Sequence, residues 1–351
     1  MTGTMKALLK TARGVGNMEI QQVPIPEVAP DEVLVKVACV GVCGTDVKIY
    51  DDTFYSDVPV IIGHEFAGEI VELGSEVSGL TVGERVVSEQ HWKACGVCRY
   101  CLTGKRHLCS SKRSPGYLSD GAYADYIAVK QSLIHKIPEG LPYEQACLIE
   151  PMGIAAHAIF EKVKIEVADK VVILGSGPIA LIALQIVKAL GAGWVCLTGL
   201  DADEPYRFPL AKKLGADRLV NVMHEDITQI VMDETNGVGA DVVIDLSGAG
   251  VAIAQAFGFI RKDGRFCAIG LPHGNISVPW ADMVLKAVNV FFSYSSGYET
   301  WERCLNLIST GKVNLTDFTD AVYPLEDWYQ AIEDARKGKV LKAIIRVNDI
   351  K

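Results

Sequence analysis

Several features that mark particular classes of protein are missing from this sequence. It has no block of basic residues and its formal net charge is −9, so nucleic acid is not expected as the main partner. No apolar run reaches the length needed to span a bilayer; residues 171–190 come nearest, but their glycines and Lys188 indicate a buried strand and helix. Low-complexity tracts and internal repeats are also missing. The classes of protein that remain are a globular enzyme and a globular binding protein, neither of which is expected to bind a membrane.

A secretory signal is not evident either. Residues Met1 to Lys10 are of mixed polarity and contain too few apolar residues for a signal peptide or a membrane anchor. The chain nevertheless has ten cysteines, which without such a signal indicate a reducing compartment where thiols bind metals or pack in the core. We therefore expect a cytoplasmic protein. Its 351 residues are too many for one comfortable hydrophobic core, so two domains are expected.

Four of the cysteines lie close together, at Cys95, Cys98, Cys101 and Cys109. Two CxxC steps that share a central cysteine, closed by a fourth thiol after the turn-forming Gly104, can place four sulfurs around one tetrahedral ion. An iron–sulfur or redox role is the alternative, and disulfide pairing is disfavoured in a reducing compartment. We predict a structural Zn²⁺ with four thiolate ligands. Because such a site has no open position for a substrate, the reaction must take place elsewhere.

Two kinds of sequence pattern follow one another along the chain. Residues 1 to about 150 contain short β-rich runs, among them 33–40 and 70–73, separated by Gly and Pro, which predicts a mostly-β unit. From about residue 165 to 269, strand-like runs alternate with helix-length segments, as in a parallel sheet covered on both faces. The expected strands are 171–174, 194–198, 218–222, 242–246 and 266–269, and the expected helices are 179–190, 209–214, 226–235 and 251–260.

The chain becomes mixed again after about residue 290, with a helix expected near 298–309. An α/β segment between two mixed segments implies a discontinuous first domain. We therefore predict an α/β fold in which residues 1–154 and 291–351 form a mostly-β domain. Residues 155–290 are predicted to form a doubly wound parallel-sheet (Rossmann) domain.

A glycine-rich loop follows the first strand of the α/β segment, in the order Gly175-Ser-Gly177-Pro178-Ile179-Ala180. Gly175 permits a tight turn, Gly177 lets the backbone approach a pyrophosphate, and Ala180 lets the helix pack on the strand. The helix N-terminus then offers free N–H groups to the phosphates. A glycine triplet alone is a weak signal, but four further strand–helix alternations surround this one. We predict a dinucleotide site at Gly175, Gly177, Pro178 and Ile179.

The identity of the dinucleotide depends on the end of the second strand, where an acid usually binds the adenosine ribose. Gly199 stands there instead, and loss of the acid often accompanies acceptance of a 2′-phosphate, for which Arg207 is the nearest cation. Asp201, Asp203 and Glu204 would repel that phosphate, and Asp201 can take the ribose role from a slightly longer loop. A solvated loop or helix start is the other explanation for these acids. We favour NAD(H) over NADP(H).

A second group of metal-type residues is dispersed along the chain and consists of Cys43, His64, Glu65 and Glu150. Each of them alone is more commonly structural, and a single cysteine among apolar residues is usually only buried. Together they supply one thiolate, one imidazole and carboxylates. This set suits a catalytic zinc with three protein ligands and one open position.

Several of these segments resemble the zinc-dependent medium-chain alcohol dehydrogenase superfamily. Residues 63–86, GHEFAGEIVELGSEVSGLTVGERV, are similar to its zinc signature, the cysteine quartet to its structural-zinc lobe and GSGPIA to its cofactor loop. The segments 264–270 and 309–315 are also similar to it, and the motifs follow in the right order over nearly the whole chain. Residues 43–47 and 150–153 are most similar to the polyol (sorbitol) and threonine dehydrogenases. The resemblance implies a GroES-like catalytic domain.

The resemblance also implies roles for single residues. Cys43 and His64 would be zinc ligands, and Glu150 would be the third ligand or hold the zinc-bound water. Glu65 would lie beside the metal and enter its coordination sphere transiently or hold that water. Asp46 would accept a hydrogen bond from the far nitrogen of His64 and fix its tautomer.

Proton transfer would begin at Thr45, whose hydroxyl would face the substrate oxygen; a turn or helix cap is the alternative explanation for this residue. Relatives often carry a histidine two residues after Asp46, and this chain has Lys48 there. Ribose hydroxyls and water, or Lys48 with a pKa lowered by burial, would then complete the relay. Phe54, Tyr55 and Tyr117 are candidates for the substrate pocket, although packing is the more common role for each.

The resemblance implies an oxidoreductase that transfers a hydride between a secondary alcohol of a polyol or sugar alcohol and NAD(P), with two Zn²⁺ per chain. A threonine-type 3-hydroxy amino acid dehydrogenase is the alternative within the superfamily. A dinucleotide-binding protein without turnover is the alternative outside it, because a fold alone does not establish a function. Relatives commonly form dimers or tetramers through sheet-edge segments like 289–294, so we expect a homo-oligomer, dimeric or tetrameric.

Overall fold

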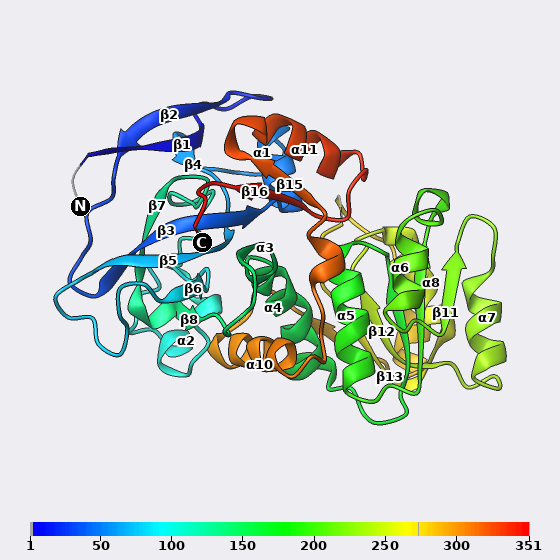
Figure 1. Cartoon of the computed structure of the whole chain (residues 1–351). Helices are drawn as coiled ribbons and strands as arrows, with labels where there is room; N and C mark the ends of the chain where they lie inside the picture. Colours follow the sequence, from blue (N-terminus) through cyan, green and yellow to red (C-terminus); the bar gives the residue numbers. More distant parts are fainter. Residues whose placement is uncertain (1–2, 273, 351) are drawn as a thin grey trace. The chain divides into compact units, whose positions relative to one another are not determined.

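The computed structural model describes residues 3–272 and 274–350, which divide into two units (Figure 1). The first unit consists of Met1–Pro151, Gly297–Asn306 and Leu315–Lys351, and the second of Met152–Ser296 and Leu307–Asn314. The boundaries expected from the sequence were 154/155 and 290/291. The chain returns to the first unit later than that, because β14 (Asn289–Phe292) pairs with a strand of the second unit.

Two sheets form the first unit. Its strands are β1 (Thr4–Lys10), β2 (Met18–Pro24), β3 (Glu32–Gly41), β4 (Val60–Ile61), β5 (Glu65–Leu73), β6 (Arg85–Ser88), β7 (Tyr126–Lys130), β8 (Ile134–Lys136), β15 (Ala321–Pro324) and β16 (Ala343–Arg346). The larger sheet has the order β15-β16-β3-β5-β6-β8, with β7 also paired to β3, and the smaller has the order β2-β1-β4. Both ends of the chain therefore contribute to one sheet, which is how a discontinuous domain is held together.

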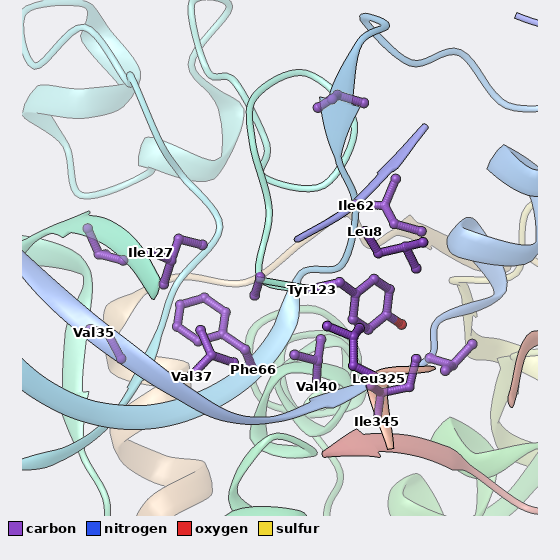
Figure 2. Close-up of a cluster of buried hydrophobic side chains, with 14 of the residues drawn as sticks. Leu8, Val35, Val37, Val40, Ile62, Phe66, Tyr123, Ile127, Leu325 and Ile345 are labelled. Carbon is purple, nitrogen blue, oxygen red and sulfur yellow. The ribbon is translucent and has the colours of Figure 1, made fainter. Parts of the chain in front are cut away.

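The core of the first unit lies around β3, whose side chains are buried on both faces because strands and loops cover it on each side. Figure 2 shows Val37 of this strand beside Phe66 and Val40 near Tyr123. Short helices surround the sheets: α1 (Gly44–Tyr50), α2 (Arg99–Leu102), α3 (Tyr143–Ala146) and α11 (Trp328–Arg336), with 3₁₀ turns at Arg106–Leu108, Gln131–Leu133, Thr316–Phe318 and Leu325–Asp327.

The second unit is one parallel sheet of six strands, in the order β11-β10-β9-β12-β13-β14. The strands other than β14 are β9 (Lys170–Leu174), β10 (Trp194–Gly199), β11 (Arg218–Asn221), β12 (Ala240–Asp245) and β13 (Ile260–Ala268). Numbered within the sheet, this order is 3-2-1-4-5-6, that of the doubly wound dinucleotide-binding fold. The five expected strands are confirmed, and β14 adds a sixth.

The helices of the second unit are α5 (Pro178–Ala189), α6 (Arg207–Lys213), α7 (Ile227–Glu234), α8 (Gly250–Phe259) and α9 (Trp280–Leu285), with a 3₁₀ turn at Asp201–Asp203. The four helices expected from the sequence are confirmed to within two residues at each end. Helix α4 (Ile149–His157) starts in the first unit and continues as a π-helix at Ala158–Val163, and α10 (Tyr298–Ser309) ends in the second. Among the described residues, no helix combines the length and the apolar character needed to cross a membrane.

Candidate metal and cofactor sites

The cysteine quartet occupies an exposed loop after β6. One ligand atom from each of Cys95, Cys98, Cys101 and Cys109 lies within 4.8 Å of the others. Of residues 93–113, only Cys101, His107 and Cys109 are buried, so few apolar contacts hold this loop. A loop without its own core needs another source of stability, and a tetrahedral ion bound by four sulfurs would provide it.

The electrostatics of the quartet fit a metal-binding role. The backbone N–H of Cys95 donates to the sulfur of Cys109 at 3.4 Å, and this hydrogen bond is the largest of several that lower the pKa of Cys109 to about 6. Burial instead raises the pKa of Cys101 to about 12. The lowered pKa of Cys109 favours the thiolate, the form that binds zinc. All four cysteines are free thiols.

A second group of ligand atoms meets inside the first unit. Atoms of Cys43, His64 and Glu65 lie within 4.8 Å of one another. Cys43 is the N-cap of α1, while Glu65 begins β5 and His64 directly precedes it; β5 pairs with the neighbouring strand β3. Gly63, just before them, has a φ of +89°, and a Cβ there would come within 2.9 Å of the Tyr123 ring. The glycine thus lets the chain turn tightly enough to bring His64 to Cys43.

Asp46 lies behind His64, as expected. Its Oδ2 accepts the backbone N–H of Cys43 at 2.9 Å and the hydroxyl of Tyr123 at 3.1 Å. Its Oδ1 lies 3.9 Å from Nδ1 of His64, and both atoms are buried without a hydrogen-bond partner. Gln90 donates to the backbone oxygen of His64 at 3.3 Å. With Nδ1 turned towards Asp46, the other ring nitrogen of His64 is left to bind a metal.

Lys342, in the loop before β16, forms a buried ion pair with Glu65. Burial alone would lower the pKa of Lys342, but the charges of Glu65 and Cys43 raise it overall, so the ammonium is retained. Gly41 makes room for this pair, because a Cβ at that position would overlap the Glu65 carboxylate and reach within 3.0 Å of Cε of Lys342. The glycine at the end of β3 is therefore required by the site.

Glu150, in the first turn of α4, is buried but lies outside the group of atoms that meet within 4.8 Å. Burial raises its pKa to about 7, and the charges of His64 and Glu65 act on it. Burial, followed by the charge of Glu65, likewise raises the pKa of the Cys43 thiol. Among the described residues, the buried carboxyl groups of Glu150, Asp46 and Glu65 and the half-buried Cys43 thiol share this region with two bases, His64 and Lys342. A divalent cation would balance this charge, and thiolate, imidazole and carboxylate are the ligands that zinc prefers.

Thr45 and Lys48 both lie on α1 and are half-buried. The Thr45 hydroxyl is 3.7 Å from the sulfur of Cys43, which places it beside the metal-type group. Among the pocket candidates, the Tyr117 ring stands edge-on to Phe54 at 5.3 Å and lies 6.4 Å from His64. Tyr55 is instead exposed and hydrogen-bonds Asp57.

The glycine-rich loop joins β9 to α5, as predicted. Gly175 has a φ of +105°, and a Cβ there would lie 3.3 Å from the backbone of Ser247, so the turn itself requires glycine. Gly177, the N-cap of α5, differs, because a Cβ there would meet no atom within 4 Å. The chain's own packing does not explain this glycine, whereas the close approach of a pyrophosphate to the helix N-terminus does.

The end of β10 explains why no acid occupies position 199. A Cβ on Gly199 would come within 2.5 Å of the Phe208 ring, so packing excludes any side chain. Asp203 is buried and accepts from Arg207 at 3.0 Å and from the backbone N–H of Leu200 at 2.8 Å. Asp201 is 64% exposed, and its pKa is lowered by hydrogen bonds from Asn221 and by His224. Asp201 therefore combines exposure with a lowered pKa, which favours its charged form.

Comparisons with known proteins agree with this architecture. Residues 29–139 match the family model of the alcohol dehydrogenase GroES-like domain, and residues 178–310 match that of zinc-binding dehydrogenases. Similar proteins include the D-arabitol-phosphate dehydrogenase of Enterococcus avium (35% identical, 99% of both chains) and the sorbitol dehydrogenase of Halalkalibacterium halodurans (37%, 97% of this chain and 99% of that one). The L-threonine 3-dehydrogenase of Caldanaerobacter subterraneus is 36% identical, and the match covers 98% of this chain and 99% of that one.

Among solved structures, a zinc-binding dehydrogenase of Sinorhizobium meliloti bound to NADP has a TM-score of 0.91 and 28% identity, with 98% of this chain and 100% of that chain covered. The parallel sheet with its glycine-rich turn and the GroES-like unit define a zinc-type oxidoreductase. The chain belongs to the zinc-dependent medium-chain alcohol dehydrogenase family, in which its relatives are polyol and threonine dehydrogenases. The family, the fold class and the dehydrogenase activity expected from the sequence are confirmed.

Three residues that contact the metal-type group or Asp46 were not identified from the sequence: Tyr123, Lys342 and Gln90. Each lies far along the chain from its partner and in no recognisable motif. The one available signal was Lys342, a lysine directly before the apolar run Ala343-Ile-Ile345. A charge next to a buried strand needs a partner, but the sequence alone does not say which.

Proposed function

We propose that the chain oxidises a secondary alcohol of a polyol or sugar alcohol with NAD(P)⁺ and reduces the ketose in reverse. The observation that carries this proposal is the meeting of Cys43, His64 and Glu65 within 4.8 Å in the interior of the first unit. A bound zinc would make the alcohol proton more acidic, and the dinucleotide would accept the hydride. The arabitol-phosphate and sorbitol dehydrogenases among the relatives named above are called after polyol substrates, which supports the substrate class.

In this proposal each residue has a distinct task. Cys43, His64 and Glu65 hold the catalytic zinc, and Glu150 orients the water or substrate hydroxyl beside it. Thr45 takes the alcohol proton, because its hydroxyl lies 3.7 Å from the sulfur of Cys43. Lys48, on the same helix, would pass that proton outward together with water and ribose hydroxyls. The cysteine quartet holds a second, structural zinc.

We also propose that NAD(H) is preferred to NADP(H). The pyrophosphate would lie at the N-terminus of α5, against Gly175, Gly177, Pro178 and Ile179. Asp201, exposed after β10, would accept hydrogen bonds from the ribose hydroxyls. The ion pair of Arg207 with Asp203 leaves that arginine poorly placed to neutralise a 2′-phosphate. The affinities for NADH and NADPH, measured by fluorescence titration, test this preference.

The zinc content of purified protein tests the proposed metal sites. We expect two zinc ions per wild-type chain, and one zinc and no turnover in Cys43→Ala. Cys304→Ala is the matched control, since Cys304 is also a buried thiol of the first unit but lies in neither cysteine group. This control should keep both zinc ions and full activity. Full turnover in Cys43→Ala, or fewer than two zincs in the wild type, would contradict the assignment.

A threonine-type 3-hydroxy amino acid dehydrogenase is the second candidate, because a relative 36% identical carries that name. A steady-state screen separates the two candidates. Sorbitol, xylitol, galactitol, a phosphorylated arabitol and threonine are each tested with NAD⁺ and NADP⁺. Polyol turnover with no threonine turnover supports the first candidate, and the opposite result supports the second.

We further propose that the chain forms a homo-oligomer through the edge of the parallel sheet. Strand β14 ends that sheet, and Phe292 on it is 76% exposed. A mostly apolar groove of about 900 Å³ adjoins it, and Trp280, which lines this groove, is also exposed. A second copy would cover both the open strand and the groove. Sedimentation equilibrium of the wild type and of Phe292→Asp tests this, with dissociation expected in the variant.

A further inference from the structure

Tyr123 is fully buried in the core of the first unit, in the segment before β7. Its ring lies close to Leu8 and Ile62 in Figure 2, and its edge packs against Gly63. Phenylalanine would fill this space equally well. A hydroxyl in an apolar core lowers stability unless it is hydrogen-bonded, so the bonds that it makes indicate why it is there.

The Tyr123 hydroxyl has one proton and two acceptors within reach. Oδ2 of Asp46 is 3.1 Å away and the backbone oxygen of Gly41 is 3.3 Å away. An ionised carboxylate is the stronger acceptor, so the proton points to Asp46. Burial and the charges of Asp46 and Glu65 raise the pKa of Tyr123 well above its ordinary value, which keeps the hydroxyl protonated and able to donate.

Two donors therefore hold Oδ2 of Asp46, the Tyr123 hydroxyl and the backbone N–H of Cys43. A single hydrogen bond would let the carboxylate rotate about its bond to Cβ, whereas two bonds from different directions fix its plane. The fixed plane turns Oδ1 towards Nδ1 of His64, at 3.9 Å, and neither of these buried atoms has another partner. Tyr123, which bonds the other oxygen of the Asp46 carboxylate, thus helps to fix the distance between Oδ1 of Asp46 and Nδ1 of His64.

We propose that Tyr123 is a positioning residue of the metal site, whose hydroxyl fixes the Asp46 carboxylate and thereby the tautomer and ring orientation of His64. This inference rests on the proposed function, since it assumes a zinc bound by Cys43 and His64. Partners that orient a metal-bound histidine typically change metal affinity or activity by about 10–100-fold. Tyr123 bonds Asp46 and not the histidine itself, so we expect an effect near the lower end of this range, about tenfold.

The test compares Tyr123→Phe with Tyr323→Phe. The hydroxyl of Tyr323 donates to Oδ2 of Asp334 at 3.0 Å, so the control removes the same kind of bond, between β15 and α11, without touching Asp46 or His64. Each holoenzyme is mixed with a chromophoric chelator, and the release of the two zincs is followed over time. Tyr123→Phe should release the catalytic zinc about tenfold faster, with release from the quartet unchanged. Tyr323→Phe should release both as the wild type does.

Two further measurements separate positioning from packing. With Co²⁺ in the catalytic site, the visible absorption bands should shift in Tyr123→Phe and stay unchanged in Tyr323→Phe, because they report ligand geometry and not global stability. In an Asp46→Asn background, Tyr123→Phe should add no further acceleration of zinc release, since its effect passes through Asp46. Thermal unfolding midpoints check that both phenylalanine variants are folded.

The outcomes separate this inference from the proposed function. A wild-type chain that binds zinc only at the quartet would overturn both. If the wild type binds two zincs while Tyr123→Phe keeps its release rate and its cobalt spectrum, the inference alone is wrong. It is also wrong if Tyr123→Phe accelerates zinc release equally in the Asp46→Asn background.

Discussion

The two groups of metal-type residues differ in how the chain builds them. The quartet from Cys95 to Cys109 lies in one loop, where few side chains are buried and its own turns place all four sulfurs. The group around Cys43 draws on the start of α1, the start of β5, the first turn of α4 and the loop before β16. In the quartet a metal would organise the chain, whereas at Cys43 the folded chain organises the ligands before a metal binds.

This difference implies opposite responses to damage. A loop that depends on its ion loses its structure when the ion is removed. A group held by strands of one sheet and by two helices keeps its structure but retains charges that need a partner. The predictions below test that contrast, beginning with the largest expected effect.

Replacing Cys95 and Cys109 together by serine should unfold the quartet loop. Structural zinc sites in small domains contribute about 10–16 kcal/mol of binding free energy, far more than this loop can gain from its few buried side chains. We expect poor yield, a lower thermal midpoint and rapid protease cleavage within residues 93–113. A stable double variant that loses only turnover would show that the quartet belongs to the reaction and not to the fold.

Replacing Lys342 by methionine should cost about 3–5 kcal/mol of unfolding free energy, because Glu65 would remain buried without its cation. Lys339→Met is the control; Lys339 is 58% exposed and pairs with Asp334 at 3.1 Å, so its loss should cost less than about 1 kcal/mol. Urea unfolding measures both variants. Adding Glu65→Gln to Lys342→Met should recover much of the loss, and equal costs for the two lysines would contradict the role given to Lys342.

The two glutamates near Cys43 should differ in their effect on zinc affinity. Glu65 belongs to the atoms that meet within 4.8 Å, while Glu150 lies outside them. Glu65→Gln should therefore weaken zinc binding by more than the roughly 10–100-fold that removal of an outer hydrogen-bond partner causes, and Glu150→Gln should stay within that range. Competition with a chelator of known affinity measures both. A larger effect of Glu150→Gln than of Glu65→Gln would instead make Glu150 the zinc ligand and Glu65 the residue that orients the water.

The smallest expected change in stability is that of Gly177→Ala. No atom lies within 4 Å of the added Cβ and the backbone φ is −67°, so the unfolding free energy should change by less than about 1 kcal/mol while NADH binding weakens. Gly199→Ala is the counterpart, because its Cβ would lie 2.5 Å from the Phe208 ring and should cost about 1–3 kcal/mol. Unchanged NADH affinity in Gly177→Ala would remove the argument for a pyrophosphate there.

What could be predicted from the sequence follows the same contrast. The five strands and four helices of the parallel sheet were predictable because each is local, with an apolar run or a 3.6-residue period of its own. The quartet and the loop Gly175–Ala180 were predictable because spacing within a few residues carries their chemistry. The dispersed candidates Cys43, His64, Glu65 and Glu150 could be collected by residue type, but no local pattern connects them, and only the family resemblance implied a role for each.

Tyr123 and Lys342 could not be predicted in the same way. Lys342 meets Glu65 only when β16 and β5 both pair with β3. Tyr123 reaches Asp46 from a segment whose backbone bonds to Leu8 and Ile62. The sequence showed that Gly199 stands where an acid is usual. It did not show why, since the Phe208 ring that fills the space belongs to a later helix. The roles of Tyr123 and Lys342 and the need for glycine at position 199 all depend on contacts between segments that are distant in the sequence.

The place of Lys342 in the chain sets an order for synthesis. A ribosome releases the N-terminal residues first, so Cys43, Asp46 and Glu65 emerge long before the cation that partners Glu65. Strand β16, which follows Lys342 directly, also pairs with β3 only once nearly the whole chain has been made. A zinc ion at the quartet, as proposed, would bind as soon as that loop has emerged. The buried metal group is therefore among the last parts of the newborn chain to mature.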